Sequence, residues 1–397
     1  AQDPFVILEY TTPAEKGWMM LYSEDGHFEG DVSLAYSGAG GKTSVALTSA
    51  RTTGSIGKAS TTLPKAADYQ KPTGKSNAKV TDFMLTETPE GFHYAFNAIG
   101  TDYMLLYWRS KEQTVTQPVY PDENGHYEGD VVSELTFART QFTVQVKSGS
   151  GSMKKEATVR KGYQAPEAPQ RQEGRLSGVT VCIDAGHQEN GRFVNEPIGP
   201  GLTGSTSGKG GMAQGTKTNR RESIVCLEIG MLLRDELLRQ GANVVMTRED
   251  QTTFHTNIER CEIAEAGGAQ IMLRLHCNNS SNRSKRGIQV YGPLNSDYAK
   301  AVADADTYRE MGQKLLDAMK TRVGMTLANS TGMVRLNDNY VGNNWAKMMC
   351  FLVEMGYLSN PAEEYLLVTP VYQQWLAEGM ADGVYEIAVA RGWVQAQ

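Results

Sequence analysis

Three apolar, strand-like runs in the second half of the chain end in side chains that can bind a metal, and this feature constrains the fold most strongly. The runs lead to the Asp-Ala-Gly turn before His187, to His276 and to Glu354. Short runs of this composition are typical of buried strands. In open α/β sheets, ligands bind in the crevice beyond the carboxyl ends of the strands. Two imidazoles and a carboxylate at one such edge predict a zinc site.

Strand-like and helix-like patterns alternate around these runs, which predicts an α/β domain over residues 176–397. The expected strands are Val179–Ile183, Ala242–Arg248, Ile271–Asn278, Gly287–Gly292 and Met349–Glu354. The expected helices are Arg221–Gln240, Asn257–Ala266, Ala299–Val323 and Tyr372–Arg391. This order favours a mostly parallel, twisted sheet flanked by helices.

The first part of the chain, up to about residue 162, has the pattern of an all-β region. Runs rich in β-branched and aromatic residues alternate there with turn residues. The expected strands are Trp18–Tyr22, Val32–Tyr36, Ser44–Leu47, Val80–Thr86, His93–Ala98, Tyr103–Trp108, Val131–Phe137 and Gln141–Lys147.

An internal repeat divides this all-β region. Asp25–Val32 matches Asn124–Val131 almost residue for residue. Such a repeat predicts two tandem, immunoglobulin-like modules, which we place at residues 1–75 and 76–162. Residues 49–79 are rich in Ser, Thr, Gly, Lys and Pro, a composition typical of a mobile connection.

The repeat carries a histidine and a glutamate in each copy, His27 with Glu29 and His126 with Glu128. These pairs could bind a metal. A Gly-His-x-Glu-Gly-Asp turn can also enter a strand with its polar side chains bonded to local backbone. We favour the second interpretation.

A change of character at residues 163–175 marks a domain boundary. This stretch contains two prolines among polar residues. Such a composition favours an extended, semi-stiff spacer.

Charge and hydropathy exclude several classes of partner. The formal net charge of −6 is mild and no block of like charges stands out, which excludes nucleic acid. No apolar run approaches the ~20 residues needed to span a membrane. The sequence opens at Ala1 with neither Met nor a signal-type apolar core. We expect an exported, extracellular or cell-wall protein whose signal peptide has been removed, although a shortened chain would also fit.

The five cysteines are odd in number and show no Cys-x-x-Cys spacing. Most lie within apolar runs, where a free cysteine behaves as a small hydrophobic residue. We therefore expect buried thiols rather than a disulfide scaffold. Cys277, next to His276, is a weak candidate nucleophile.

Two polar segments adjoin the expected site. Residues 189–219 are rich in glycine and leave directly from His187; they are either a substrate-contacting or gating loop or an insertion without function. Asn337–Trp345 combines amides with two aromatic residues. For this segment we expect substrate contacts, with Asn344 and Trp345 as the candidates.

The spacing of residues in the sequence does not identify the third zinc ligand. Catalytic zinc usually takes three protein ligands and leaves one position for water. Glu222 follows Asn219 at the start of an expected helix, and Asn-x-x-Glu is also the pattern of a capping box. From the residue types, Glu222 is therefore either a zinc ligand or the capping residue of the helix.

The motifs of residues 176–392 together resemble the zinc-dependent N-acetylmuramoyl-L-alanine amidases of the Amidase_3 family. The segments that carry the resemblance are Cys182–His187, Arg221–Glu222, Val245–Arg248, Ile258–Arg260, Leu275–Asn278, Gly287–Tyr291 and Val353–Asn360. The resemblance implies His187, Glu222 and His276 as zinc ligands and Glu354 as the catalytic acid and base. Two features depart from the family pattern: the stretch between His187 and Glu222 is long, and Arg274 stands where serine is common.

The resemblance implies hydrolysis of the amide between the lactyl group of N-acetylmuramic acid and L-alanine in peptidoglycan. Zinc would activate the water, and Glu354 would carry its proton to the departing amine. Asp184 is expected to orient the loop or a ligand by hydrogen bonding rather than to bind zinc.

Two alternatives accompany this expectation. One is a zinc peptidase or carboxypeptidase that acts on wall peptides. The other is a non-catalytic surface protein that binds the cell wall. If the chain is an amidase, we expect its N-terminal modules to bind wall or protein and to hold the enzyme at its substrate.

Overall fold

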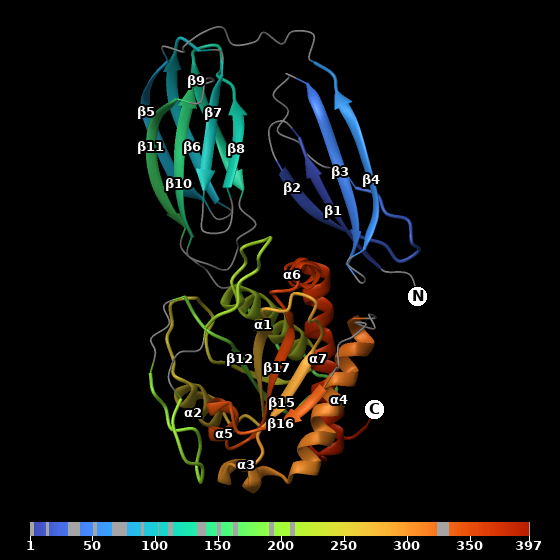
Figure 1. The fold of residues 1–397 in the computed structure, drawn as a ribbon. Coiled ribbons are helices and arrows are strands. Elements are labelled where there is room, and N and C mark those ends of the chain that lie inside the picture. Colours follow the sequence, from blue (N-terminus) through green and yellow to red (C-terminus); the bar gives the residue numbers. More distant parts are fainter. Residues whose placement is uncertain are drawn as a thin grey trace. The chain divides into compact units, whose positions relative to one another are not determined.

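The computed structural model describes residues 4–12, 16–30, 40–50, 54–65, 78–88, 91–101, 103–109, 114–132, 140–148, 152–161, 166–189, 194–206, 211–323 and 333–396. The chain divides into two compact units, Ala1–Tyr163 and Gln164–Gln397 (Figure 1).

The first unit begins with a four-stranded antiparallel sheet in the order β2-β1-β3-β4. Its strands are β1 (Phe5–Thr11), β2 (Lys16–Tyr22), β3 (Gly41–Ser49) and β4 (Ser55–Leu63). β4 lies within the stretch predicted as a mobile connection, so that prediction is wrong for its residues. β4 is polar and mostly exposed, and the backbone ladder to β3 holds it at the sheet edge. The expected strand Val32–Tyr36 lies outside the described residues.

Seven further strands form two sheets that share one core. One sheet contains β5 (Lys79–Thr88), β6 (Gly91–Ile99) and β9 (His126–Val132); the other contains β11 (Met153–Lys161), β10 (Thr140–Ser148), β7 (Met104–Arg109) and β8 (Thr114–Val119). Aromatic side chains from both sheets fill the space between them, with Phe92 contacting Trp108 and Phe142. The sheets therefore form a β-sandwich.

The repeated histidines bond as the turn interpretation predicts. The backbone N–H of His27 donates to Asp25 Oδ1, and that of His126 donates to Asp122 Oδ1, both at 2.9 Å. Among the described residues, no group of three metal-binding side chains includes either histidine.

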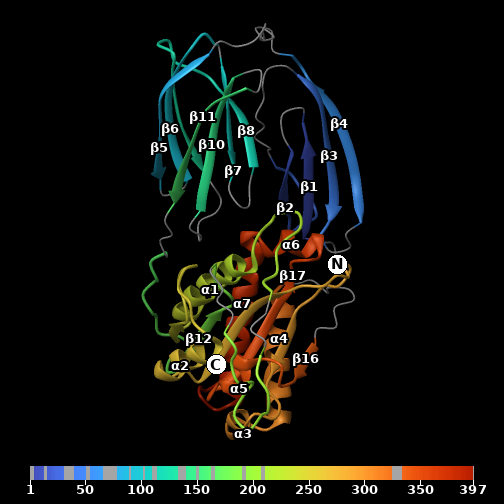
Figure 2. The same ribbon diagram turned by 60° about the vertical axis from the view of Figure 1, so that its left-hand side comes forward.

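The second unit contains a six-stranded sheet in the order β13-β12-β14-β17-β15-β16. Figure 2 labels β12, β17 and β16 of this sheet. Neighbouring strands are parallel except for β15 and β17. The sheet is therefore mostly parallel, as predicted. The strands are β12 (Thr180–Ala185), β13 (Asn243–Met246), β14 (Ile271–Asn278), β15 (Gln289–Gly292), β16 (Met333–Leu336) and β17 (Met349–Tyr357).

Helices pack on both faces of this sheet. Gly230 of α1 packs near Ile183 and Ala185 on one face. Residues of α2 pack on the other face, in a cluster with Cys182, Met272 and Cys350. The helices are α1 (Glu222–Arg239), α2 (Asn257–Ala266), α3 (Asp297–Val302), α4 (Ala305–Val323), α5 (Val341–Trp345), α6 (Pro361–Leu367) and α7 (Pro370–Ala390).

The long helix predicted over Ala299–Val323 is two helices. Ala303 has an extended backbone, with φ −165° and ψ 162°, and ends α3. Asp304 then accepts a hydrogen bond from the Thr307 N–H and starts α4. The sequence expectation missed this break because the apolar spacing continues across it.

The proline-containing stretch after Tyr163 is held against α1. Arg234 donates to the Pro166 carbonyl oxygen at 3.1 Å, and the Gln172 N–H donates to the Leu238 carbonyl oxygen at 3.0 Å. These residues are thus part of the second unit rather than a free spacer.

The five cysteines are unpaired and buried, as predicted. Within the described part of the chain, no helix combines the length and the apolar character needed to cross a membrane.

Candidate active site

Three side chains that can bind a metal converge at the carboxyl edge of the sheet. His187 follows β12, Glu222 is the first residue of α1, and His276 lies on β14. Glu222 Oε1 is 3.2 Å from His187 Nε2 and 3.0 Å from His276 Nδ1. One ligand atom from each residue lies within 4.8 Å of the others. The structure thus brings together the three residues that the resemblance implies as ligands.

The surroundings of Glu222 decide between its two sequence interpretations. The Ala213 N–H donates to Oε2 at 2.7 Å, and the Cys277 N–H donates to Oε1 at 3.0 Å. The N-cap of α1 is Arg221, and no side chain caps this helix. The capping-box interpretation is therefore wrong, and the carboxylate faces the two histidines instead.

The pKa shifts of Glu222 and His276 favour the forms of these two side chains that bind metals. Burial opposes the ionisation of Glu222, but attraction to His187 and hydrogen bonds from both histidines outweigh burial and hold its pKa below the ordinary value. Burial lowers the pKa of His276, although its hydrogen bond to Glu222 acts in the opposite direction. Carboxylate and neutral imidazole are the forms that bind metals.

Glu354 brings a second carboxyl group to the same edge. It is paired with His276 in the register of the parallel strands β14 and β17. Its Oε2 atom is buried and has no hydrogen-bond partner among the described residues. Burial raises the pKa of Glu354 well above its ordinary value, and the negative charge of Glu222 raises it further. Such a group is suited to accept and release a proton.

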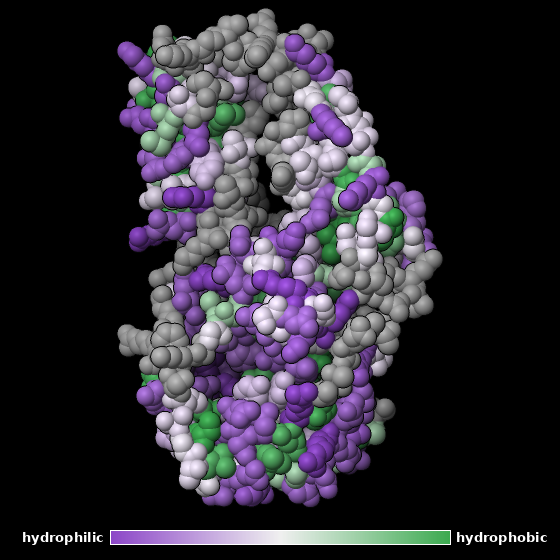
Figure 3. Space-filling view, viewed as in Figure 1, coloured by the Kyte–Doolittle hydropathy of each residue, from purple (hydrophilic) through white to green (hydrophobic). Residues whose placement is uncertain are grey.

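These four residues line a cleft of about 570 Å³. Further lining comes from the segment before α2, from the insertion after His187 and from the segment before α5; it includes Val194, Glu196, Thr206, His255, Asn257 and Tyr340. On the face drawn in Figure 3, the surface of the second unit is largely hydrophilic. The volume of the cleft leaves room for a substrate beside the metal-binding cluster, and its polar lining residues suit a polar one.

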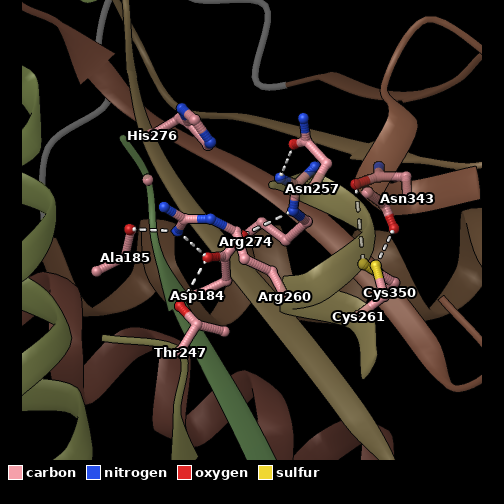
Figure 4. Close-up of polar contacts among 12 residues, drawn as sticks. Asp184, Ala185, Thr247, Asn257, Arg260, Cys261, Arg274, His276, Asn343 and Cys350 are labelled. Carbon is pink, nitrogen blue, oxygen red and sulfur yellow. Dashed lines mark hydrogen bonds and ion pairs between the residues drawn. The ribbon is translucent and has the colours of Figure 1, made fainter. Parts of the chain in front are cut away.

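Asp184 supports the site from beneath. It is fully buried, and Arg260 and Arg274 both pair with it, the second through Nε at 2.8 Å. Thr247 Oγ1 donates to the same carboxylate at 2.8 Å. Figure 4 shows these side chains converging on Asp184 below His276. Asp184 therefore accepts hydrogen bonds and does not reach the metal-binding cluster.

Two arginines hold the turn that presents His187, a role that the sequence did not reveal. Arg248 donates to the carbonyl oxygens of Ala185 and Gly186 at 2.7 and 2.9 Å. Arg260 donates to the His187 carbonyl oxygen at 3.2 Å. The signal available in the sequence was the presence of arginine beside apolar runs, where a buried charge requires partners.

The backbone of this turn is tightly constrained. His187 has φ +57°, a left-handed conformation that is uncommon for residues other than glycine. A Cβ atom on Gly186 would lie 2.4 Å from the Leu275 carbonyl oxygen. Glycine is therefore required at this position by the close approach of β14.

Asn344 and Trp345, predicted as substrate contacts, are placed differently. Asn344 is fully buried and donates to the Ile198 carbonyl oxygen at 3.0 Å. Trp345 Nε1 donates to the Pro197 carbonyl oxygen at 2.8 Å. Neither residue is among those that line the cleft. These hydrogen bonds anchor the insertion through its backbone carbonyl groups, and direct contact of either residue with substrate stays a prediction.

The insertion is further anchored by its own carboxylate. Glu196 is buried and accepts hydrogen bonds from the N–H groups of Asn257 and Ile258, the first residues of α2. The Asp297 N–H donates to the Pro200 carbonyl oxygen. Residues 194–206, one described part of the insertion, therefore form a fixed wall of the cleft.

Cys277 is not a nucleophile in this arrangement. Its side chain is buried, and burial raises the pKa of its thiol well above the ordinary value, with the neighbouring Cys226 thiol adding to the effect. A reactive cysteine needs an accessible, readily ionised thiol.

Comparison with known proteins identifies the family. The Amidase_3 family model, N-acetylmuramoyl-L-alanine amidase, matches residues 181–386, which is just over half of the chain. The germination-specific N-acetylmuramoyl-L-alanine amidase of Bacillus subtilis is 26% identical over 231 residues, which cover 55% of this chain and 83% of that protein. The probable cell wall amidase LytH of Staphylococcus aureus is 27% identical over 218 residues, which cover 54% of this chain but only 60% of that protein.

Solved structures also match the second half of this chain. An N-acetylmuramyl-L-alanine amidase of Mycobacterium abscessus superposes with a TM-score of 0.48 and 20% identity, over 53% of this chain and 99% of that one. An N-acetylmuramoyl-L-alanine amidase of Clostridium difficile 630 gives a TM-score of 0.42 and 23% identity, over 53% of this chain and 96% of that one. On the extent of the family match, this chain belongs to the Amidase_3 family of N-acetylmuramoyl-L-alanine amidases.

Proposed function

We propose that the chain is a zinc-dependent peptidoglycan hydrolase. It cleaves the amide that joins the lactyl group of N-acetylmuramic acid to L-alanine of the stem peptide. The observation that carries this proposal is the position of Glu354, whose unpartnered, buried oxygen lies in one cleft with His187, Glu222 and His276.

The donor set fits zinc. Tetrahedral zinc with ligands at about 2.0–2.1 Å separates neighbouring ligand atoms by about 3.3 Å. The two separations from Glu222 to the histidine nitrogens are 3.2 and 3.0 Å. When bound, zinc lowers the pKa of water toward about 7 and polarises a carbonyl group.

The chain's own residues supply the remaining chemistry. Glu354 takes the proton from the attacking water and then gives it to the amine of L-alanine as the amide bond breaks. Glu222 and the two histidines keep their positions because the backbone N–H groups and arginines described above fix them. The cleft walls orient the substrate and limit access of water to the reacting amide.

Several finer features belong to the same proposal. The β region holds two immunoglobulin-like modules, at residues 1–75 and 76–162, which bind wall or protein. Residues 163–175 join them to a catalytic domain at 176–397. The protein acts outside the cell, at the cell wall.

Digestion of purified peptidoglycan tests the activity. An amidase releases free amino groups of L-alanine and creates no reducing sugars. Cleavage within the stem peptide would show a zinc peptidase instead, and no release would show a non-catalytic binder. Inactivation by a chelator, followed by recovery with zinc, would establish the metal.

A further inference from the structure

A tight loop precedes the metal-binding carboxylate. At its base, the Glu222 N–H donates to the Ala213 carbonyl oxygen at 2.9 Å, and the Ala213 N–H donates to Glu222 Oε2 at 2.7 Å. The Gly215 N–H donates to the Arg220 carbonyl oxygen at 2.9 Å. The position of Ala213 therefore sets the rotation of the Glu222 carboxylate, and this rotation leaves Oε1 facing the histidines.

The tip of the same loop encloses a second carboxylate. Three successive N–H groups, of Thr216, Lys217 and Thr218, donate to the two oxygens of Glu364 at 2.5, 2.5 and 3.1 Å. Glu364 lies in the first turn of α6 and is fully buried. Successive backbone N–H groups form a concave anion site of this kind only while the loop keeps its shape.

The loop backbone leaves little freedom to rearrange. A Cβ atom on Gly215 would lie 2.6 Å from Thr218 Oγ1 and 3.2 Å from Glu364 Oε2. Asn219 has φ +55°, in the left-handed region. Without an anion at its tip, this loop would lose the acceptor that three of its successive N–H groups share.

We propose that Glu364 is a positioning residue for the metal ligand Glu222. Its carboxylate fixes the loop tip, the loop fixes Ala213, and Ala213 fixes Glu222 in the orientation that binds the metal. The inference rests on the proposed metal site. Outer partners that orient a ligand typically change metal affinity by about 10–100-fold when they are removed.

A general contribution to stability is the competing explanation, and Glu236 provides the matched control. Glu236 is also buried and bonds to Arg239 and Gln240 at the far end of α1. It lies 14 positions after Glu222, a distance of about 21 Å along the helix. Its loss should destabilise the same unit without moving the loop.

The experiment compares the full chain with Glu364→Ala, Glu364→Gln and Glu236→Gln. Zinc affinity is measured by competition with a chromophoric chelator, and the visible spectrum of the cobalt-substituted protein reports ligand geometry. We expect Glu364→Ala to bind zinc about 10–100-fold more weakly, with an altered cobalt spectrum. Glu364→Gln, which keeps one acceptor oxygen, should lose less, and Glu236→Gln should stay within twofold of the wild type.

The outcomes separate this proposal from the proposed function. Wild-type zinc affinity with an unchanged cobalt spectrum in both Glu364 variants would overturn the positioning role and leave the metal site intact. An equal loss of affinity in Glu236→Gln would show a stability effect and also overturn it. Should Glu364→Ala fail to fold, Glu364→Gln alone decides. A wild-type chain that binds no zinc would instead contradict the proposed function.

Discussion

At the scale of single residues, the two acids of the cleft differ because their neighbours differ. Glu222 faces two imidazoles and two backbone N–H groups, which favour its ionised form. Glu354 has a buried oxygen without a partner among the described residues and the charge of Glu222 nearby, which raise its pKa and so its affinity for a proton. Two carboxyl groups whose environments push their pKa values apart are a common basis for assigning a ligand and a proton carrier.

We predict that Glu354→Gln retains zinc and loses turnover by about 10²–10⁴-fold, because only the proton transfer is removed. His276→Ala should instead lower the zinc content. Metal analysis alongside rates on soluble muropeptides checks both. Near-wild-type turnover in Glu354→Gln would contradict the role assigned to Glu354.

The buried carboxyl of Glu363 predicts a pH dependence of stability. Burial raises the pKa of Glu363 from 4.5 to about 7, although hydrogen bonds from the Tyr357 and Gly287 N–H groups oppose this shift. Because the folded state holds this proton more tightly than the unfolded state, its contribution is present below pH 4.5. That contribution is lost as the pH rises through 7, by about 3 kcal/mol in total.

Glu363→Gln should therefore flatten the fall in the free energy of unfolding between pH 4.5 and 7. Urea unfolding at a series of pH values measures it. Parallel pH profiles for the variant and the wild type would show that Glu363 does not titrate in this range.

At the scale of elements, the insertion and the short helix α5 act together as one wall of the cleft. α5 supplies the Asn344 and Trp345 donors, and the insertion supplies the carbonyl acceptors. Glu196 fixes the same segment to the start of α2. A glycine-rich stretch without periodicity thus becomes ordered because residues of α5 and α3 donate to its backbone carbonyl groups and its Glu196 side chain accepts from α2.

Replacing Trp345 with Phe keeps an aromatic side chain but removes the pyrrole N–H and its hydrogen bond to Pro197, worth about 1 kcal/mol. We expect amide hydrogen exchange within residues 194–206 to accelerate about fivefold. Lys347→Ala is the control, because Lys347 pairs with Glu265 at an exposed position nearby. Equal exchange in the Trp345 variant and the control would mean that the hydrogen bond does not hold the wall.

At the scale of the whole molecule, the two units have separate cores. All of the proposed metal ligands, the cleft and the arginine support belong to residues 164–397. The chemistry therefore does not require the β strands of the first unit.

We predict that a chain starting at residue 164 keeps its rate on small soluble muropeptides and acts more weakly on whole cell walls. Parallel assays on the two substrates, together with wall sedimentation, measure the difference. Wall binding that survives the truncation undiminished would refute a targeting role for the β region.

The sequence determined the α/β half well, because buried parallel strands and amphipathic helices have strong patterns. Asn257–Ala266 was predicted to the residue. In the β half, β1, β4, β8 and β11 were missed. The last three are edge strands, where backbone pairing stabilises polar residues, whereas β1 lies inside its sheet. In the repeat, His126 begins β9, whereas His27–Gly30 form no strand and residues 31–39 lie outside the described part of the chain.

The sequence alone identified three candidate site residues, His187, His276 and Glu354. Each follows or ends an apolar run that is typical of a buried strand. Tertiary structure decided the contacts that Glu222 and Trp345 make. Glu222 has two equally good local interpretations; the family resemblance favours the zinc ligand, and the contacts with Ala213 and Cys277 replace those of a capping box. The partner of Trp345 lies 148 positions away, on a segment without any periodic signal. Contacts between segments so distant in sequence leave no local pattern, because the energy that fixes them arises only when the chain is folded.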